Sequence, residues 1–200
     1  MLRAILAAVR SASGAMFVGN GANARVAHAL DDAPWVFYMM GSMGMCAPLA
    51  AGFSRFAGRP VVAVEGDGNA VMGLSGLPVV AAAARPPFLH IVLDNGTYET
   101  TGGQRVLAPD LLFVRAAGGA GYDPVRDIAG MEELADALER GLVAEQVGFL
   151  RVRIEPDTAP LPPRVRYSPE QIPPRFIAAC RPRDGASRTT IAGGDREHDG

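Results

Sequence analysis

The chain has 200 residues, of which 48% are hydrophobic, 6% aromatic and 20% charged, and its formal net charge is −2. This length is enough for one domain with its own core. A charge so close to zero excludes the extended basic surface that is typical of nucleic-acid or anionic-membrane binding.

The cysteines and the first residues exclude further classes. Cys46 and Cys180 belong to no CxxC pair, so we expect neither a zinc site, an iron–sulfur cluster nor a disulfide framework. The apolar segment 4–9 ends at Arg10 and is too short for a signal peptide, and no apolar run reaches transmembrane length. We therefore expect a cytoplasmic protein.

The N-terminal half alternates between helical and strand patterns. In chain order we expect a helix over 2–10, a strand over 15–20, a helix over 22–30, a strand over 35–40, a helix over 44–57, a strand over 59–66, a helix over 75–85 and a strand over 87–95. Pro78 is compatible with the last of these helices if Ser75 is its N-cap, because a proline in the first turn lacks only an N–H that would be free anyway.

The C-terminal half contributes fewer expected elements. We expect a helix over 131–147 and a strand over 148–156. Seven prolines lie between Pro156 and Pro174, which predicts an extended surface segment, and the polar residues 181–200 predict a disordered tail. The nearly continuous apolar strands predict an α/β fold, a doubly wound and mostly parallel sheet with helices on both faces. The expected division is one domain over 1–178 and a tail over 179–200.

Polar or glycine-rich segments follow four of these strands, at residues 19–21, 41–44, 66–69 and 94–97. The carboxyl ends of parallel strands open onto one edge of the sheet, where ligands bind in open α/β folds. Carboxylate and amide oxygens suit Mg²⁺ or Ca²⁺, and glycine N–H groups at helix starts bind phosphate oxygens. The pattern indicates a divalent cation that bridges a phosphate. The alternative is a set of ordinary tight turns, which a single GDG does not exclude.

The spacing of two of these segments is more specific. Gly66-Asp67-Gly68 is followed by 26 residues and then Asn95. With GSMG before it, this pattern resembles the diphosphate-binding domain of thiamin-diphosphate-dependent enzymes, whose fold it implies. The segments FYMMGSMGM, EGDGNAVMGLSGL and LDNGTYETTGGQ more narrowly resemble the sulfopyruvate and phosphonopyruvate decarboxylases, over roughly residues 1–178.

The resemblance implies a role for each motif residue. Asp67 and Asn95 would bind Mg²⁺ through side-chain oxygens and Thr97 through its carbonyl. The Gly41 carbonyl would accept a hydrogen bond from the aminopyrimidine of thiamin diphosphate. Met43 would be the wedge that bends the cofactor, which suits a flexible thioether, although a core position is the alternative for this methionine. The other cofactor-binding residues implied are Asn20, Gly21, Ser42, Gly66, Gly68 and Asn69.

The resemblance also implies a partner. Members of this family activate the pyrimidine with a glutamate from a separate pyrimidine-binding domain, for which this chain has no room. Glu65 directly precedes the metal-binding motif and is not expected to replace that glutamate. We therefore expect a β-type subunit that works with a pyrimidine-domain α subunit in an α2β2 or larger hetero-oligomer, with no nucleic-acid or membrane partner.

The expected activity is a non-oxidative carboxy-lyase reaction that converts a small anionic 2-oxoacid, 3-sulfo- or 3-phosphonopyruvate, to the aldehyde and CO₂. His28, Arg85 and Arg105 are candidates for binding its anionic group, and each also fits an ordinary surface residue. The segment 164–176 resembles the tail of these decarboxylases and is expected to cover the site or contact a partner. Three alternatives are an acetolactate-synthase-like carboligase, a ferredoxin-linked oxidoreductase, which the lack of cluster cysteines disfavours, and a scaffold subunit, which would not need Asp67 and Asn95.

Overall fold

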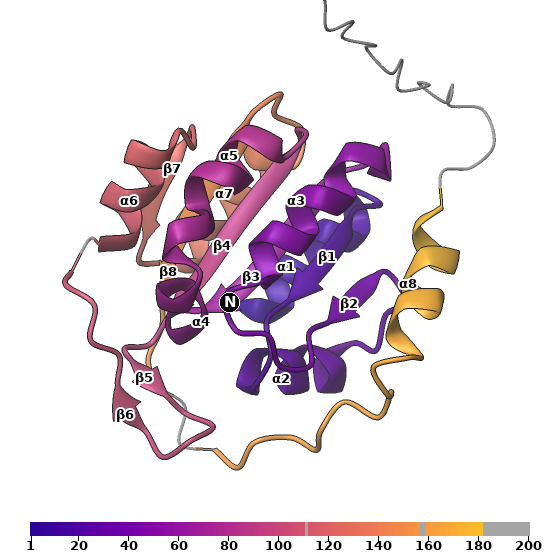
Figure 1. Cartoon of the computed structure of the whole chain (residues 1–200), viewed down its shortest axis with the longest axis horizontal. Helices are drawn as coiled ribbons and strands as arrows, with labels where there is room; N and C mark the ends of the chain where they lie inside the picture. Colours follow the sequence, from indigo (N-terminus) through magenta and orange to yellow (C-terminus); the bar gives the residue numbers. More distant parts are fainter. Residues whose placement is uncertain (111, 157–158, 182–200) are drawn as a thin grey trace, which may run out of the picture.

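A computed structural model describes residues 1–110, 112–156 and 159–181, so the predicted tail lies almost wholly outside the described residues. One six-stranded sheet forms the centre of the molecule (Figure 1). Every pair of neighbouring strands in it is parallel. In spatial order the strands are β2 (Val36–Tyr38), β1 (Ala15–Val18), β3 (Val61–Gly66), β4 (Phe88–Asp94), β8 (Val147–Arg153) and β7 (Val125–Ile128).

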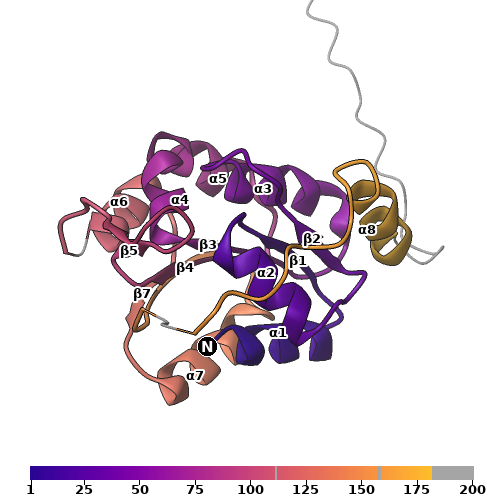
Figure 2. The same cartoon turned by 90° about the horizontal axis from the view of Figure 1, so that it is seen from below.

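Helices cover both faces of this sheet, which confirms the predicted fold class (Figure 2). Successive residues of β3 point to opposite faces, so Val62 and Val64 join one buried cluster and Val61 and Ala63 join the other. The first cluster includes side chains of α1 (Leu2–Ser11), α2 (Ala22–Leu30) and α7 (Met131–Gly141). The second includes side chains of α3 (Cys46–Ala57), α5 (Leu77–Ala83), α6 (Leu112–Ala120) and α8 (Ile172–Cys180).

The strand order places the site. From β1 the chain first adds β2 on one side and then returns to add β3 on the other side. The connection after β1 leads to one side of the sheet and the connection after β3 leads to the other side. This divergence opens a crevice beyond the carboxyl ends of β1 and β3. The segments 19–21 and 66–69 therefore adjoin at this crevice.

Two expected helices differ from the structure. The segment expected to be helical over 75–85 is a 3₁₀ turn, η1 (Leu74–Gly76), followed by α5. Gly76 rather than Ser75 is the N-cap of α5, while Pro78 does lie in its first turn. The helix expected over 131–147 ends at Gly141, so α7 is shorter than predicted.

Several elements were not predicted at all. They are α4 (Asp67–Met72), α6, β7, α8 and a small antiparallel hairpin of β5 (Thr97–Tyr98) and β6 (Gln104–Arg105). The extended segment expected to reach Pro174 is wrong at its end, because α8 begins at Ile172 with prolines in its first turn, where they are tolerated. The same helix runs past the domain boundary predicted at residue 178.

Residues 159–171, the C-terminal strap, contain no regular element and pass α2 on the way to α8 (Figures 1 and 2). The Arg25 side chain of α2 donates to the carbonyls of Pro162 at 2.5 Å and Leu161 at 3.3 Å. The Asp32 carboxylate accepts hydrogen bonds from Arg166, Tyr167 and Arg175. The strap is thus fastened to the body of the domain at two places.

No helix in the described part of the chain combines the length and the hydropathy that a membrane crossing needs.

Candidate cofactor site at the carboxyl edge of the sheet

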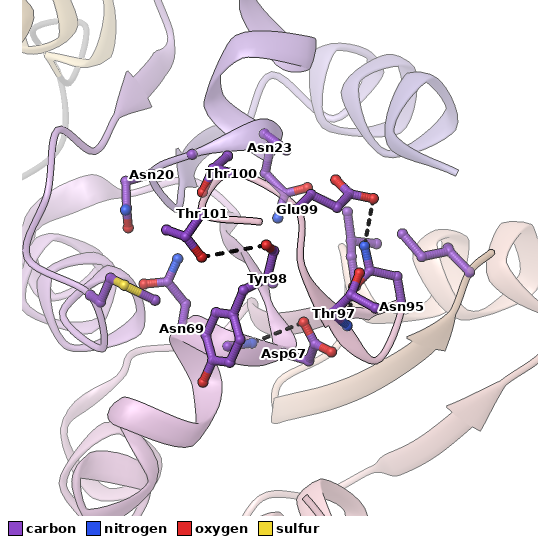
Figure 3. Close-up of a pocket in the computed structure, with 17 residues that line it drawn as sticks. Asn20, Asn23, Asp67, Asn69, Asn95, Thr97, Tyr98, Glu99, Thr100 and Thr101 are labelled. Carbon is purple, nitrogen blue, oxygen red and sulfur yellow. Dashed lines mark hydrogen bonds between the residues drawn. The ribbon is translucent and has the colours of Figure 1, made fainter. Parts of the chain in front are cut away.

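A cavity opens at the carboxyl edge of the sheet, and we call it the edge cavity (Figure 3). It is lined by the turn between β1 and α2, the turn that contains Met43, the junction of β3 and α4, the loop after β4, and Ile154 after β8. Of the residues predicted to bind cofactor or metal, the edge cavity is lined by Asn20, Gly21, Met43, Gly66, Asp67, Gly68, Asn69, Asn95 and Thr97.

Asp67 is the first residue of α4 and is 3% exposed. Its Oδ1 accepts a hydrogen bond from the Gly68 amide at 2.9 Å and its Oδ2 accepts one from the Gly96 amide at 2.8 Å. Burial raises the pKa of Asp67 to about 6, the nearby Asp94 carboxylate adds to this rise, and the two amide hydrogen bonds oppose it. The carboxylate is therefore held rigidly in a place where a cation would relieve the cost of its burial.

Asn95 lies across the cavity from Asn69 and is tied into its own loop (Figure 3). Its Oδ1 accepts a hydrogen bond from the Thr97 amide at 2.9 Å, and its Nδ2 donates one to Glu99 Oε1 at 2.7 Å. Glu99 was not singled out from the sequence, although its position four residues after Asn95 suits such a turn. The described residues contain no group of three His, Cys, Asp or Glu that could hold a metal, so a cation here needs amide and carbonyl oxygens.

Gly68 leaves room for an aromatic ring. A methyl group at this position would lie 2.3 Å from the ring of Tyr98, so no other residue permits this packing. The Tyr98 ring therefore packs over the first turn of α4. The buried Asn20 Oδ1, on the opposite wall, has no hydrogen-bond partner among the described residues.

The turn 41–44 has a left-handed backbone at three positions, with φ of 83° at Gly41, 53° at Ser42 and 85° at Gly44. It projects Met43 into the edge cavity, whereas Gly41 lines a neighbouring cavity and Ser42 lines neither of these two cavities. Asn69 Oδ1 accepts a 3.1 Å hydrogen bond from the Gly44 amide and so fixes the end of the turn.

A buried polar network lies beneath the site. His90 Nε2 is 2.7 Å from Glu65 Oε1, and His90 Nδ1 is 3.1 Å from the Tyr122 hydroxyl. Glu65 is 2% exposed and His90 1%, so both side chains belong to the core. Because the Glu65 side chain is engaged in the core and does not line the edge cavity, this glutamate stays unavailable to a cofactor.

Arg151 connects the loops on the far side of the site. It is 9% exposed and lies 2.7 Å from Asp94, 2.7 Å from Asp110 and 3.6 Å from Asp127. Neither Arg151 nor Asp94 was identified from the sequence. Because Asp94 also raises the pKa of Asp67, Arg151 limits the negative charge beside the Asp67 carboxylate.

The three basic residues considered for the substrate are dispersed. His28 lies 3.7 Å from Asp32, near the end of α2 that faces away from the edge cavity. Arg85 precedes β4 and hence lies at the amino edge of the sheet, opposite the site, which excludes it. Arg105 is exposed on β6 and lines neither cavity.

Known proteins are similar to this chain in sequence and in fold. Residues 19–153 match the family model described as thiamine pyrophosphate enzyme, C-terminal TPP binding domain. The phosphonopyruvate decarboxylase of Streptomyces viridochromogenes is 34% identical over 175 residues, which are 87% of this chain and 44% of that protein. The chain thus spans less than half the length of this relative.

A second relative is closer to this chain in length. The sulfopyruvate decarboxylase subunit beta of Methanothermobacter thermautotrophicus is 32% identical over 163 residues, covering 80% of this chain and 84% of that subunit. Among solved structures, the thiamine diphosphate-dependent 4-hydroxybenzoylformate decarboxylase of Rhodococcus jostii aligns with a TM-score of 0.58 and 26% identity, over 79% of this chain and 33% of that chain.

Proposed function

Because residues 19–153 match its C-terminal TPP-binding domain, the chain belongs to the thiamine pyrophosphate enzyme family, and from this premise we propose that it is the β subunit of a cytoplasmic, Mg²⁺-dependent 2-oxoacid decarboxylase. The substrate is 3-sulfopyruvate or 3-phosphonopyruvate, and the products are the corresponding aldehyde and CO₂. Relatives named for both decarboxylations, at 34% and 32% identity, support this substrate class.

The observation that carries the proposal is the convergence of Asp67 and Asn95 on one cavity from two different strand ends. A buried carboxylate whose pKa is raised to about 6 favours a bound cation. A side-chain amide oxygen and a backbone carbonyl complete a set of hard oxygen donors, which suits Mg²⁺. We therefore assign Asp67, Asn95 and the Thr97 carbonyl to the metal.

The remaining residues fit the cofactor. The Gly68 and Asn69 amides at the start of α4 and the Asn20–Gly21 turn would bind the diphosphate, with Gly66 allowing its close approach. The unpartnered Asn20 Oδ1 is one polar atom that a bound molecule would satisfy. Gly41, Ser42 and Met43 would hold the pyrimidine end. Thiamin diphosphate, when bound, supplies the electron sink that decarboxylation of a 2-oxoacid requires.

The partner is an α subunit that carries the pyrimidine domain and its activating glutamate. The match to 84% of a protein named subunit beta supports a split enzyme. Glu65 is buried against His90 and does not line the edge cavity, so this chain offers no glutamate from β3 for that role.

The test is CO₂ release by the chain co-expressed with a pyrimidine-domain subunit, in the presence of thiamin diphosphate and Mg²⁺. Sulfopyruvate, phosphonopyruvate and pyruvate are compared, and we expect release from one of the two anionic substrates. No release from any of them would contradict the decarboxylase assignment. Full activity of the isolated chain would contradict the split-enzyme assignment alone.

A further inference from the structure

A second cavity, which we call the strap cavity, adjoins the edge cavity. It shares Asn20, Gly21 and Thr100 with the edge cavity, and it also contains Gly41, whose carbonyl is assigned above to the pyrimidine. Its volume is about 500 Å³, which is within the range of small-molecule sites. Whatever binds here lies next to the cofactor.

The charge of the strap cavity is positive. Arg25 and Arg164 line it, and its lining includes no Asp or Glu. By contrast, the residues that line the edge cavity include two acidic residues, Asp67 and Glu99, but no Arg or His. Since the chain contains no lysine, arginines supply all its permanently charged cationic side chains. An anionic group of a substrate is therefore favoured on the strap side of the site.

The two arginines differ in what they already bind. The Arg25 guanidinium donates to the carbonyls of Leu161 and Pro162 and so holds the strap. Arg164 is exposed, and its side chain has neither a hydrogen bond nor an ion pair within the described ranges. Arg164 is thus the cation of this cavity that is available to a ligand.

The position of Arg164 is fixed from both sides. Two residues before it, Pro162 is held by Arg25, and two and three residues after it, Arg166 and Tyr167 are held by Asp32. Between these points the Val165 side chain packs against the core. A guanidinium on an anchored backbone loses less freedom on binding than one on a free loop.

We propose that Arg164 binds the sulfonate or phosphonate group of the substrate and gives the enzyme its preference for 2-oxoacids with a second anionic group. The inference rests on the proposed function for the identity of the substrate. Its physical basis is general: a guanidinium forms paired, charge-assisted hydrogen bonds with the oxygens of such groups. Pyruvate has no group at C3 that could use this arginine.

The experiment measures binding without turnover. The chain in complex with the pyrimidine-domain subunit, saturated with thiamin diphosphate and Mg²⁺, is titrated calorimetrically with 3-sulfopropanoate, 3-phosphonopropanoate and propanoate, which lack the 2-oxo group and cannot react. We expect the wild type to prefer one of the two dianions over propanoate by roughly 10- to 100-fold, as a charged hydrogen-bonded pair predicts. Arg164→Ala should reduce this ratio to about one, and Arg164→Lys should restore part of it. Arg115→Ala, on the exposed side of α6, is the matched control and should keep the wild-type ratio.

Three results would overturn the proposal: no preference in the wild type, an unchanged preference in Arg164→Ala, or a preference lost in Arg105→Ala but kept in Arg164→Ala. The binding preference of the wild type for the anionic ligands and the release of CO₂ are independent results, so either can be negative without the other. A protein that prefers the dianions through Arg164 but releases no CO₂ contradicts the decarboxylase and leaves the anion site in place. An active decarboxylase whose Arg164→Ala variant keeps its selectivity for the anionic substrate over pyruvate contradicts the role of Arg164 alone.

Discussion

The Gly44 amide donates a 3.1 Å hydrogen bond to the side-chain oxygen of Asn69 and thereby joins the turn before α3 to helix α4. Both residues are buried, so replacing Asn69 with alanine leaves an unsatisfied amide. We expect Asn69→Ala to lower the free energy of unfolding by about 1–3 kcal/mol and to weaken thiamin diphosphate binding. Urea unfolding and calorimetry measure the two effects. Met72→Ala, at an exposed position on α4, is the control, and an equal loss in both variants would contradict the role of the bond.

Gly44 also lies against Gly73. A methyl group on Gly44 would be 2.8 Å from the Gly73 nitrogen, and the φ of Gly44 is 85°. Gly44→Ala should therefore lower the free energy of unfolding by about 2 kcal/mol or more, because a clash adds to the backbone strain. Gly52→Ala in α3, where a methyl group meets nothing within 4 Å, should instead raise stability by about 0.5–1 kcal/mol. Thermal unfolding of both variants checks the contrast, and similar melting temperatures would contradict it.

The raised pKa of Asp67 predicts a pH dependence. In the unfolded chain this carboxyl titrates near 4, whereas in the folded chain its pKa is about 6. Protonation therefore favours the folded state, and the metal-free protein should lose on the order of 3 kcal/mol of stability as the pH rises from 4 to 7. This loss should be absent in Asp67→Asn. Urea unfolding at several pH values without Mg²⁺ measures it, and parallel curves for the two proteins would refute the prediction.

The same titration should govern the metal. Mg²⁺ binds the carboxylate and not the carboxylic acid, so Mg²⁺-dependent binding of thiamin diphosphate should weaken about tenfold per pH unit below pH 6. Asp67→Ala should abolish the Mg²⁺ dependence at every pH. Calorimetric titrations at pH 5, 6 and 7.5 test both statements. An affinity that does not change over this range would show that Asp67 is not a metal ligand.

The buried pair of Glu65 and His90 predicts coupled effects on stability. His90→Leu removes the partner of a carboxylate that is 2% exposed, and we expect a loss of about 3 kcal/mol or more. Glu65→Gln keeps a hydrogen-bonding side chain and should cost less. The double replacement of Glu65 and His90 by leucine should recover most of the loss from His90→Leu, because no buried polar side chain of the pair is then left without its partner. Additive losses in a double-mutant cycle would argue against the pairing.

Asp32 is expected to control the C-terminal strap. Asp32→Ala removes the acceptor shared by Arg166, Tyr167 and Arg175, so the strap should become accessible to trypsin at Arg164 and Arg166. The measurement is limited proteolysis followed by mass spectrometry. Asp136→Ala removes an exposed carboxylate that pairs with Arg126 and Arg140, and this control should keep the wild-type cleavage rate. Identical rates in the two variants would show that the strap is held in some other way.

In the central sheet, the sequence predicted the strands that are rich in apolar residues and missed β7, which is not. Strand β3, from Val61 to Gly66, reads as a continuous apolar run, and its alternate residues fill the two cores. Strand β7 is four residues long, and only Ile128 in it is buried. Its sequence, VRDI, has no apolar run, so only its pairing with β8 defines it as a strand. Prolines similarly concealed α8, because the two that begin it were counted with the extended segment before it.

Part of the site can be predicted from the spacing of residues within the sequence, and the rest depends on contacts between segments that are distant in the chain. Asp67 and Asn95 follow two strands that are neighbours both in sequence and in the sheet, so their convergence could be predicted. Arg151 meets Asp94 only because β8 pairs with β4, although 57 residues separate them in the chain. The cavity that contains Arg164 likewise forms where the strap returns past α2. No pattern within one segment shows these partners.

The place of Met1 has a practical consequence for expressing the protein. Met1 and Glu99 line the same hollow at the carboxyl edge, and Glu99 also borders the edge cavity. Arg181, the last described residue, lies beside Arg59 and Gly58 at the opposite edge. A bulky group attached at Met1 would therefore lie next to the residues proposed to bind the cofactor, whereas one attached at Arg181 would lie at the opposite edge of the sheet.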